Sequence, residues 1–302
     1  MAHRPDAWYA AADFVPLTID HMDGFVVSRI GPTGTTVLTT DDLRPEFNAG
    51  GKFTFGRRVF DCYRVEGTFM SQYNWDDSVL VTRNTGGLST FLSGFANPAS
   101  ASLDNATSVF IAERSSFRSG EINVRYWVDM PPGPLDVSLL VGVRNMDFDE
   151  HFNFTGSNAL FTNNVTSNTQ NDLWGVQVGI EFAQLITTRY WVDVDIKGGI
   201  FNDNTNFTTT FLQNGANLFA PQTGTRDRTT WMGDICVTGN WQMTPWLTVR
   251  GGYQAIFLDG VATAENQIRS PLVNLVPAPL NAANDSGRVA IHGPVLGVMA
   301  YW

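Results

Sequence analysis

The chain has 302 residues, a formal net charge of −10 and only 16% charged residues. This acidic balance, with no basic stripe to neutralise phosphates, excludes nucleic acid as a partner. No run of about 18 apolar residues occurs, so the sequence also excludes a transmembrane helix.

Alternating apolar and polar residues recur along the whole chain, which is the pattern of β-strands. In chain order we expect strands at about 7–17, 46–56, 61–73, 114–128, 135–149, 171–182, 189–203, 228–241, 246–259 and 288–302. Short connections (GRRV, MPPGP, AQLITT, QMTP) alternate with long ones at 18–45, 74–113, 150–170, 204–227 and 260–287. Short turns at one end and long loops at the other are typical of bacterial outer-membrane barrels. The predicted fold is all-β: one domain, residues 1–302, forming a single transmembrane antiparallel up-and-down β-barrel of about ten strands, or of twelve.

Aromatic residues bracket the apolar face of several predicted strands. In WMGDICVTGNW, Trp231 and Trp241 enclose Ile235 and Val237 on one face. Ten tilted strand residues span roughly 25 Å, which is the separation of two interfacial aromatic girdles. The predicted girdle contains Tyr63, Tyr73, Trp174, Phe182, Trp231, Trp241 and Trp302.

The opposite faces carry charges, which would cost roughly 2–4 kcal/mol each for Arg or Lys at the lipid midplane and must therefore face the lumen. The predicted lumen residues are Arg64, Glu66, Glu121, Arg125, Glu181, Asp193, Asp195, Lys197, Asp234 and Arg250. Because a ten-stranded barrel is narrow, we expect a network of ion pairs that substantially fills it, including Lys197 with Asp234 and Arg125 with Asp136. An open conduit for small solutes is the alternative. On the last strand, the alternate positions that are expected to face outward also include Pro294 and His292. Placing these residues towards lipid would require a bulge or a position at the membrane interface.

The chain ends in VLGVMAYW, whose alternation up to Trp302 resembles the signal read by the barrel assembly machinery. The expected partners are therefore outer-membrane lipid and that machinery. We also expect a monomer that resides in the outer membrane of a Gram-negative-type bacterium. The first residues do not read as a signal peptide, and we expect that one has been removed.

Three segments resemble the beta-barrel porin family that is abundant in planctomycetes: NDLWGVQVGIEF, YWVDVDIKGGIFND and WLTVRGGYQAIFLDGVATAENQ. The resemblance is clearest in residues 171–302, and WYAAADFVPL resembles the first strand of that family. It implies an outer-membrane barrel and supplies no catalytic residues.

Candidate chemistry gathers in MDFDEHF, where Asp147, Asp149 and His151 share a face beside Glu150. An Asp–His pair with a second acid could activate water at a barrel rim, or hold a divalent metal. A solvated acidic strand end is the simpler interpretation, and the trio falls on the outward face. Cys62 and Cys236 read as isolated thiols facing the interior, although a disulfide is conceivable.

The sequence therefore predicts a porin-like outer-membrane barrel with a charge-paired lumen, with no enzyme activity, no cofactor and no metal. Its predicted role is limited passage of small solutes, or a structural or surface role in the envelope. A rim hydrolase at Asp147, Asp149 and His151 is one alternative. Adhesion or ligand binding through the long loops is another.

Overall fold

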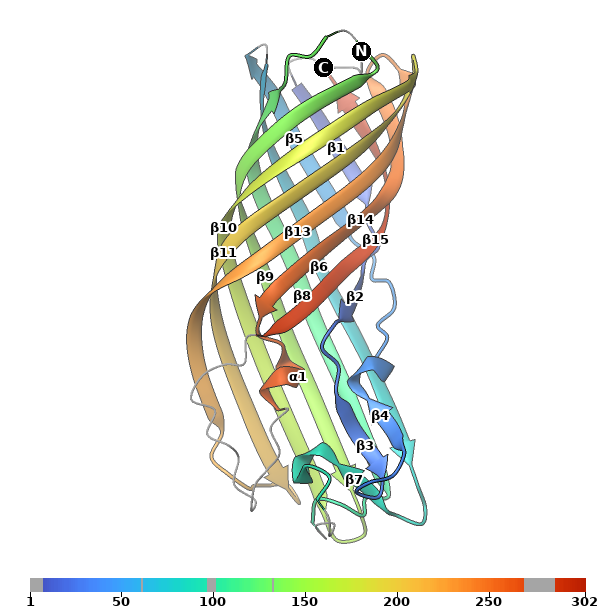
Figure 1. The fold of residues 1–302 in the computed structure, drawn as a ribbon, viewed down its shortest axis with the longest axis vertical. Coiled ribbons are helices and arrows are strands. Elements are labelled where there is room, and N and C mark those ends of the chain that lie inside the picture. Colours follow the sequence, from blue (N-terminus) through green and yellow to red (C-terminus); the bar gives the residue numbers. More distant parts are fainter. Residues whose placement is uncertain (1–7, 61, 97–101, 132, 269–285) are drawn as a thin grey trace.

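The computed structural model describes residues 8–60, 62–96, 102–131, 133–268 and 286–302, and it is a closed antiparallel barrel (Figure 1). Its wall follows the chain: β1 (Trp8–Phe14), β5 (Gly51–Phe60), β6 (Tyr63–Thr82), β8 (Ser108–Trp127), β9 (Leu135–Ser157), β10 (Thr162–Thr187), β11 (Tyr190–Gln213), β13 (Gln222–Thr244), β14 (Leu247–Val261) and β15 (Gly287–Tyr301). Pairing of β1 with β15 closes the ring. The predicted up-and-down barrel is confirmed, with ten strand positions in its wall.

The first wall strand is split by proline. Beyond β1, the chain continues as β2 (Thr18–His21), and both pair with β15 in one unbroken register. This register places Pro16 across from Pro294, and since neither residue has an N–H, the ladder cannot continue between them. His292 does face outward, as its parity indicates, and no bulge interrupts the pairing of β15 with β14 around it. It lies near the edge of the apolar belt, where its ring bonds to Asp20.

The two ends of the barrel differ. At the turn end, where β1 begins and β15 ends, the strand connections are short. At the opposite end, the loop end, the strands β8 to β13 extend far past β14 and β15 (Figure 1). The central strands are longer than predicted, so the expected loop at 150–170 is mostly wall, with only 158–161 between β9 and β10. Part of another predicted loop, 269–285, lies outside the described residues.

The sequence predicts these strands too short because their outward residues change from apolar to Asn and Thr, a composition that is also typical of loops. The alternation itself continues, with buried Phe152, Phe154 and Val165 facing inward. The barrel thus has apolar residues outside and polar ones inside near the turn end, and the reverse near the loop end.

A cap fills the loop end. It consists of β3 (Val26–Ile30), β4 (Thr36–Thr39) and β7 (Leu88–Thr90) in one small sheet, with η1 (Thr40–Asp42), η2 (Phe91–Ser93) and α1 (Ala264–Gln267). β12 (Ala216–Asn217) pairs with β11 at the rim. Side chains such as Val27, Leu88 and Phe91 pack against the inward Phe152 and Phe154 of the wall in one buried cluster. None of the helices among the described residues has the length of a membrane-spanning helix.

An apolar belt surrounds the turn-end half of the barrel, with outward residues such as Ile122, Val141, Val176 and Val178 exposed. Of the predicted girdle, Tyr63, Trp174, Trp231, Trp241 and Trp302 are exposed and Phe182 is partly buried. This exposed apolar surface requires lipid around it.

Tyr73 was wrongly assigned to the girdle. The pairing of β6 with β8 shifts between Met70 and Tyr73, so a bulge reverses the facing of every later residue on β6. Tyr73 is therefore completely buried inside the barrel and stacks on Trp75. Gly50 permits this, because a Cβ there would lie 2.2 Å from the Tyr73 ring.

The belt predicts the effect of a charge on its surface. Val178→Lys places an ammonium near the middle of the belt, and we expect the free energy of unfolding in lipid vesicles to fall by about 2–4 kcal/mol. Gln170→Lys lies on the same outward face of β10 but beyond Trp174, and it should cost little. Equal losses in denaturant titrations of the two variants would contradict this position of the membrane.

Candidate functional site

The predicted lumen charges lie inside the barrel, level with the belt, around a residual cavity of about 130 Å³. The cavity is lined by all ten: Arg64, Glu66, Glu121, Arg125, Glu181, Asp193, Asp195, Lys197, Asp234 and Arg250. They come from six strands, so their side chains meet across the lumen and not only along one sheet face.

Arg125 is the centre of one group. Its guanidinium donates to Glu66 Oε1 at 2.9 Å, to Glu181 Oε2 at 2.7 Å and to Asp195 Oδ2 at 3.0 Å. The three acids stand on β6, β10 and β11, and Arg125 itself on β8. One buried cation therefore holds three carboxylates from different parts of the wall, which is the arrangement that makes buried charge tolerable.

A second group differs from the predicted pairing. Lys197 lies opposite Asp234 in the β11–β13 register, yet its ammonium bonds to Glu121 at 2.7 Å. Asp234 instead accepts from Arg144 at 2.9 Å, across the lumen. Because these side chains are long and the lumen is narrow, they reach beyond their neighbours. For the same reason Arg125 contacts the acids named above and not Asp136, the partner expected from the sequence.

An apolar layer closes the lumen above this network, at the loop-end edge of the belt. Its core includes the fully buried Tyr73, Phe117, Phe148 and Phe201, from four strands. Tyr73 donates to the carbonyl of Val15 at 3.0 Å, and Trp75 donates to that of Leu17 at 2.7 Å. The layer thus satisfies the backbone exposed where Pro16 interrupts the first strand.

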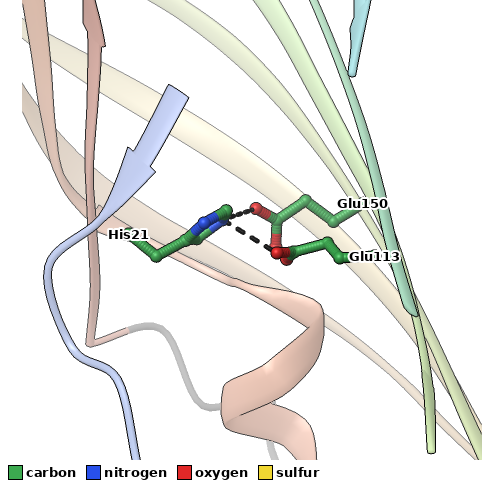
Figure 2. A group of neighbouring side chains, drawn as sticks. All are labelled: His21, Glu113 and Glu150. Atoms are coloured by element: carbon green, nitrogen blue, oxygen red, sulfur yellow. Dashed lines mark hydrogen bonds and ion pairs between the residues drawn. The ribbon is translucent and has the colours of Figure 1, made fainter. Parts of the chain in front are cut away.

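Between the apolar layer and the cap core lies a buried cluster of His21, Glu113 and Glu150 (Figure 2). His21 ends β2, and the glutamates come from β8 and β9. The His21 Nε2 atom lies 2.5 Å from Glu150 Oε1 and 3.4 Å from Glu113 Oε1. The other oxygen of Glu150 accepts from the Ala264 N–H at 2.7 Å, at the start of α1.

Burial and neighbouring charges shift the pKa of two groups in this cluster. Burial raises the pKa of Glu113 to about 8, and the negative charges of Glu150, Glu265 and Asp77 add to this. Burial alone would lower the pKa of His21, but the charges of Glu113, Glu150 and Glu265 outweigh it and raise that pKa well above 6.5. Near neutral pH the cluster therefore holds His21 as an imidazolium and Glu113 with its proton. This site lies beyond the belt, outside the membrane-spanning part of the wall.

Comparison with solved structures identifies the fold. The outer membrane protease OmpT from Escherichia coli matches over 100% of this chain and 99% of its own, with a TM-score of 0.51 and 9% identity. The fold is that of a bacterial outer-membrane β-barrel. A major outer membrane protein from Thermus thermophilus covers 96% of this chain and 98% of its own, with a TM-score of 0.34 and 11% identity.

Sequence comparison adds nothing to this: no family model matches the chain, and no similar curated protein was found. The resemblance to the planctomycete porin family accordingly stays a prediction. Matches at such low identity show the shape of the barrel and leave its activity open.

The predicted rim residues do not join the buried cluster. Asp147, Asp149 and His151 lie on the outer face of β9, where Asp147 pairs with Arg118 and His151 bonds to Asn168 at 2.6 Å. Glu150, which the sequence placed beside them, points inward to His21. The hypothesis of a rim hydrolase stays a prediction.

Sequence reasoning missed His21 and Glu113 as site residues. His21 lies in a segment predicted as loop, and Glu113 precedes the predicted start of its strand; continuing the strand alternation would have turned Glu113 and Glu150 inward together. Both cysteines are free: Cys236 lines the lumen cavity, whereas Cys62 lies in the β5–β6 turn.

The network predicts unequal roles for two arginines. Arg125→Met leaves the buried Glu66 and the half-buried Glu181 and Asp195 without their shared cation, and we expect the free energy of unfolding to fall by about 3–5 kcal/mol. Arg118→Met breaks only the exposed pair with Asp147 and should cost about 0–1 kcal/mol. Guanidinium unfolding in detergent, followed by tryptophan fluorescence, measures both; a similar loss in the two variants would refute the assigned role of Arg125.

The cluster predicts a pH dependence. Glu113 keeps its proton in the folded chain up to about pH 8 but loses it near 4.5 when unfolded, so stability should fall as pH rises between those values. The contribution of His21 is complete below about 6.5 and is lost as pH rises through its folded pKa, in the same direction.

In Glu113→Gln this decline should be shallower, because the amide does not titrate. Denaturant unfolding in the presence of a chelator from pH 5 to 9 gives the comparison. His151→Gln, on the outer face of the same strand as Glu150, serves as the control and should follow the wild type. A decline as steep in Glu113→Gln as in the wild type would contradict the assignment.

Proposed function

We propose that this chain is a sealed barrel of the bacterial outer membrane that serves a structural or surface role in the envelope. The observation that carries the proposal is the filled lumen. Ion pairs cross it at the level of the belt, and the apolar layer around Phe117 and Phe148 closes it above them.

The apolar layer is the stronger barrier. Phe117, Phe148 and Phe201 are almost completely buried, and they pack in one cluster with Ile256 of β14 and Ile291 of β15, from the other side of the wall. A hydrated ion or sugar would have to lose its water to pass between such side chains, and apolar constrictions close channels in this way. Passage of small solutes, the other role predicted from the sequence, would require this layer to open.

The ordered cap supports a role at the cell surface. Long connections of outer-membrane barrels face the exterior, whereas short turns face the periplasm. Here the long connections form a sheet of β4, β3 and β7 with a buried core shared with the wall. A rigid surface held above the membrane suits contact with other molecules or envelope components better than the movement of loops over an open pore.

Conductance tests the proposal. Purified protein inserted into planar bilayers should give no steady conductance steps, whereas a general diffusion porin in the same bilayers should. Heat-modifiable migration on gels must first show that the barrel is folded. Steady steps from the folded protein would overturn the sealed lumen and favour solute passage.

A pair of variants locates the barrier. Phe117→Ala with Phe201→Ala removes two rings from the apolar layer and should increase leakage from dye-loaded vesicles. Phe91→Ala with Phe154→Ala removes two equal rings from the cap core, leaves the layer intact, and should leave leakage unchanged. Increased leakage from the second variant alone would place the barrier in the cap.

A further inference from the structure

We propose that His21, Glu113 and Glu150 form a binding site for one divalent transition-metal cation of the zinc class, inside the barrel and beneath the cap. One donor atom from each residue, an imidazole nitrogen and two carboxylate oxygens, lies within 4.8 Å of the others. The inference concerns the interior of the loop-end half and does not depend on the proposed function.

The set of donors selects the class of metal. Zinc in proteins binds imidazole nitrogen and carboxylate oxygen at about 2.0–2.2 Å, and three protein ligands with one open position form its usual reactive site. Calcium and magnesium prefer sites made of oxygen alone. An imidazole with two carboxylates therefore favours zinc and its transition-metal neighbours.

The geometry requires only small adjustments. Donors around one such cation are about 3–4 Å apart. The 2.5 Å contact between His21 and Glu150 must therefore lengthen, whereas the 3.4 Å separation of His21 and Glu113 already fits. Figure 2 shows the three side chains converging on one point from three separate segments. The backbone N–H of Ala264 holds the far oxygen of Glu150 and directs the near one towards His21.

A second observation points independently to a cation. Glu113 Oε1 is buried, faces His21, and has no hydrogen-bond partner among the described residues. Only 3% of the Glu113 side chain is exposed. A buried oxygen left without a hydrogen-bond partner destabilises the fold, and more so when it is charged. A metal between this atom and the His21 nitrogen would supply what it lacks.

Charge balance supports the same conclusion. If both buried glutamates were ionised they would carry two negative charges, of which one imidazolium could balance only one, and without a metal Glu113 therefore keeps its proton. A divalent cation with a neutral imidazole balances both. Part of the His21 side chain, 12%, remains exposed, which leaves a side from which a cation can enter.

The test uses the full chain folded in detergent and stripped of metal with a chelator. Zinc titrated into it by calorimetry should bind at one site per chain and raise the melting temperature, and calcium at the same concentration should raise it less. Glu113→Gln, Glu150→Gln and His21→Gln should each weaken zinc binding by about 10–100-fold or more.

Matched controls lie on the outer face of β9. His151→Gln and Asp149→Asn likewise remove an imidazole and a carboxylate, next to Glu150, and should leave zinc binding unchanged. Zinc binding lost in these outer variants, or kept in the three inner ones, would overturn the proposal, as would an absence of binding.

A spectrum provides a second measurement for variants of altered stability. Cobalt(II) bound in the folded chain should show visible absorption bands of low coordination number, and His21→Gln should abolish them while the gel migration of the folded barrel remains. An unchanged cobalt spectrum in this variant would place the metal elsewhere and refute the site.

Discussion

The narrow lumen is the constraint on which the other features depend. The belt residues must face lipid, so every polar residue that alternates with them must be satisfied inside a ten-stranded ring. Arg125 meets this requirement by holding Glu66, Glu181 and Asp195 together. Such a network leaves only a small cavity, and the proposed sealing of the lumen therefore rests on side chains of its own wall.

Above the belt the same wall faces water on its outside, and the preference of each face reverses. Phe148 and Phe152 then turn inward, and Asn and Thr residues turn outward. The cap can pack on the inside only because of this reversal. Glu113 and Glu150 lie between the apolar layer and the cap core, where the cations of the lumen network do not reach them. His21 is the cation that the fold brings to them.

The strand count, the belt and the set of lumen charges could be predicted because alternation is a local signal. The bulge before Tyr73 could not, since one extra residue in a strand leaves no trace in composition. Nor could the partner of Lys197, because long side chains in a narrow lumen choose among several acids. His21 could not be predicted as a site residue for a third reason. The glutamates that it contacts lie far along the chain, and closure of the barrel brings them together.

The split first strand has a consequence for assembly. Among the described strands β2 pairs with β15 alone, the last strand of the chain, whereas β8 and β9 are consecutive strands that pair with each other. A barrel in which β15 has not yet paired with β1 and β2 would hold Glu113 and Glu150 side by side without a histidine. The cluster can therefore form only once β2 has paired with β15. Until that final step the two carboxylates would repel each other.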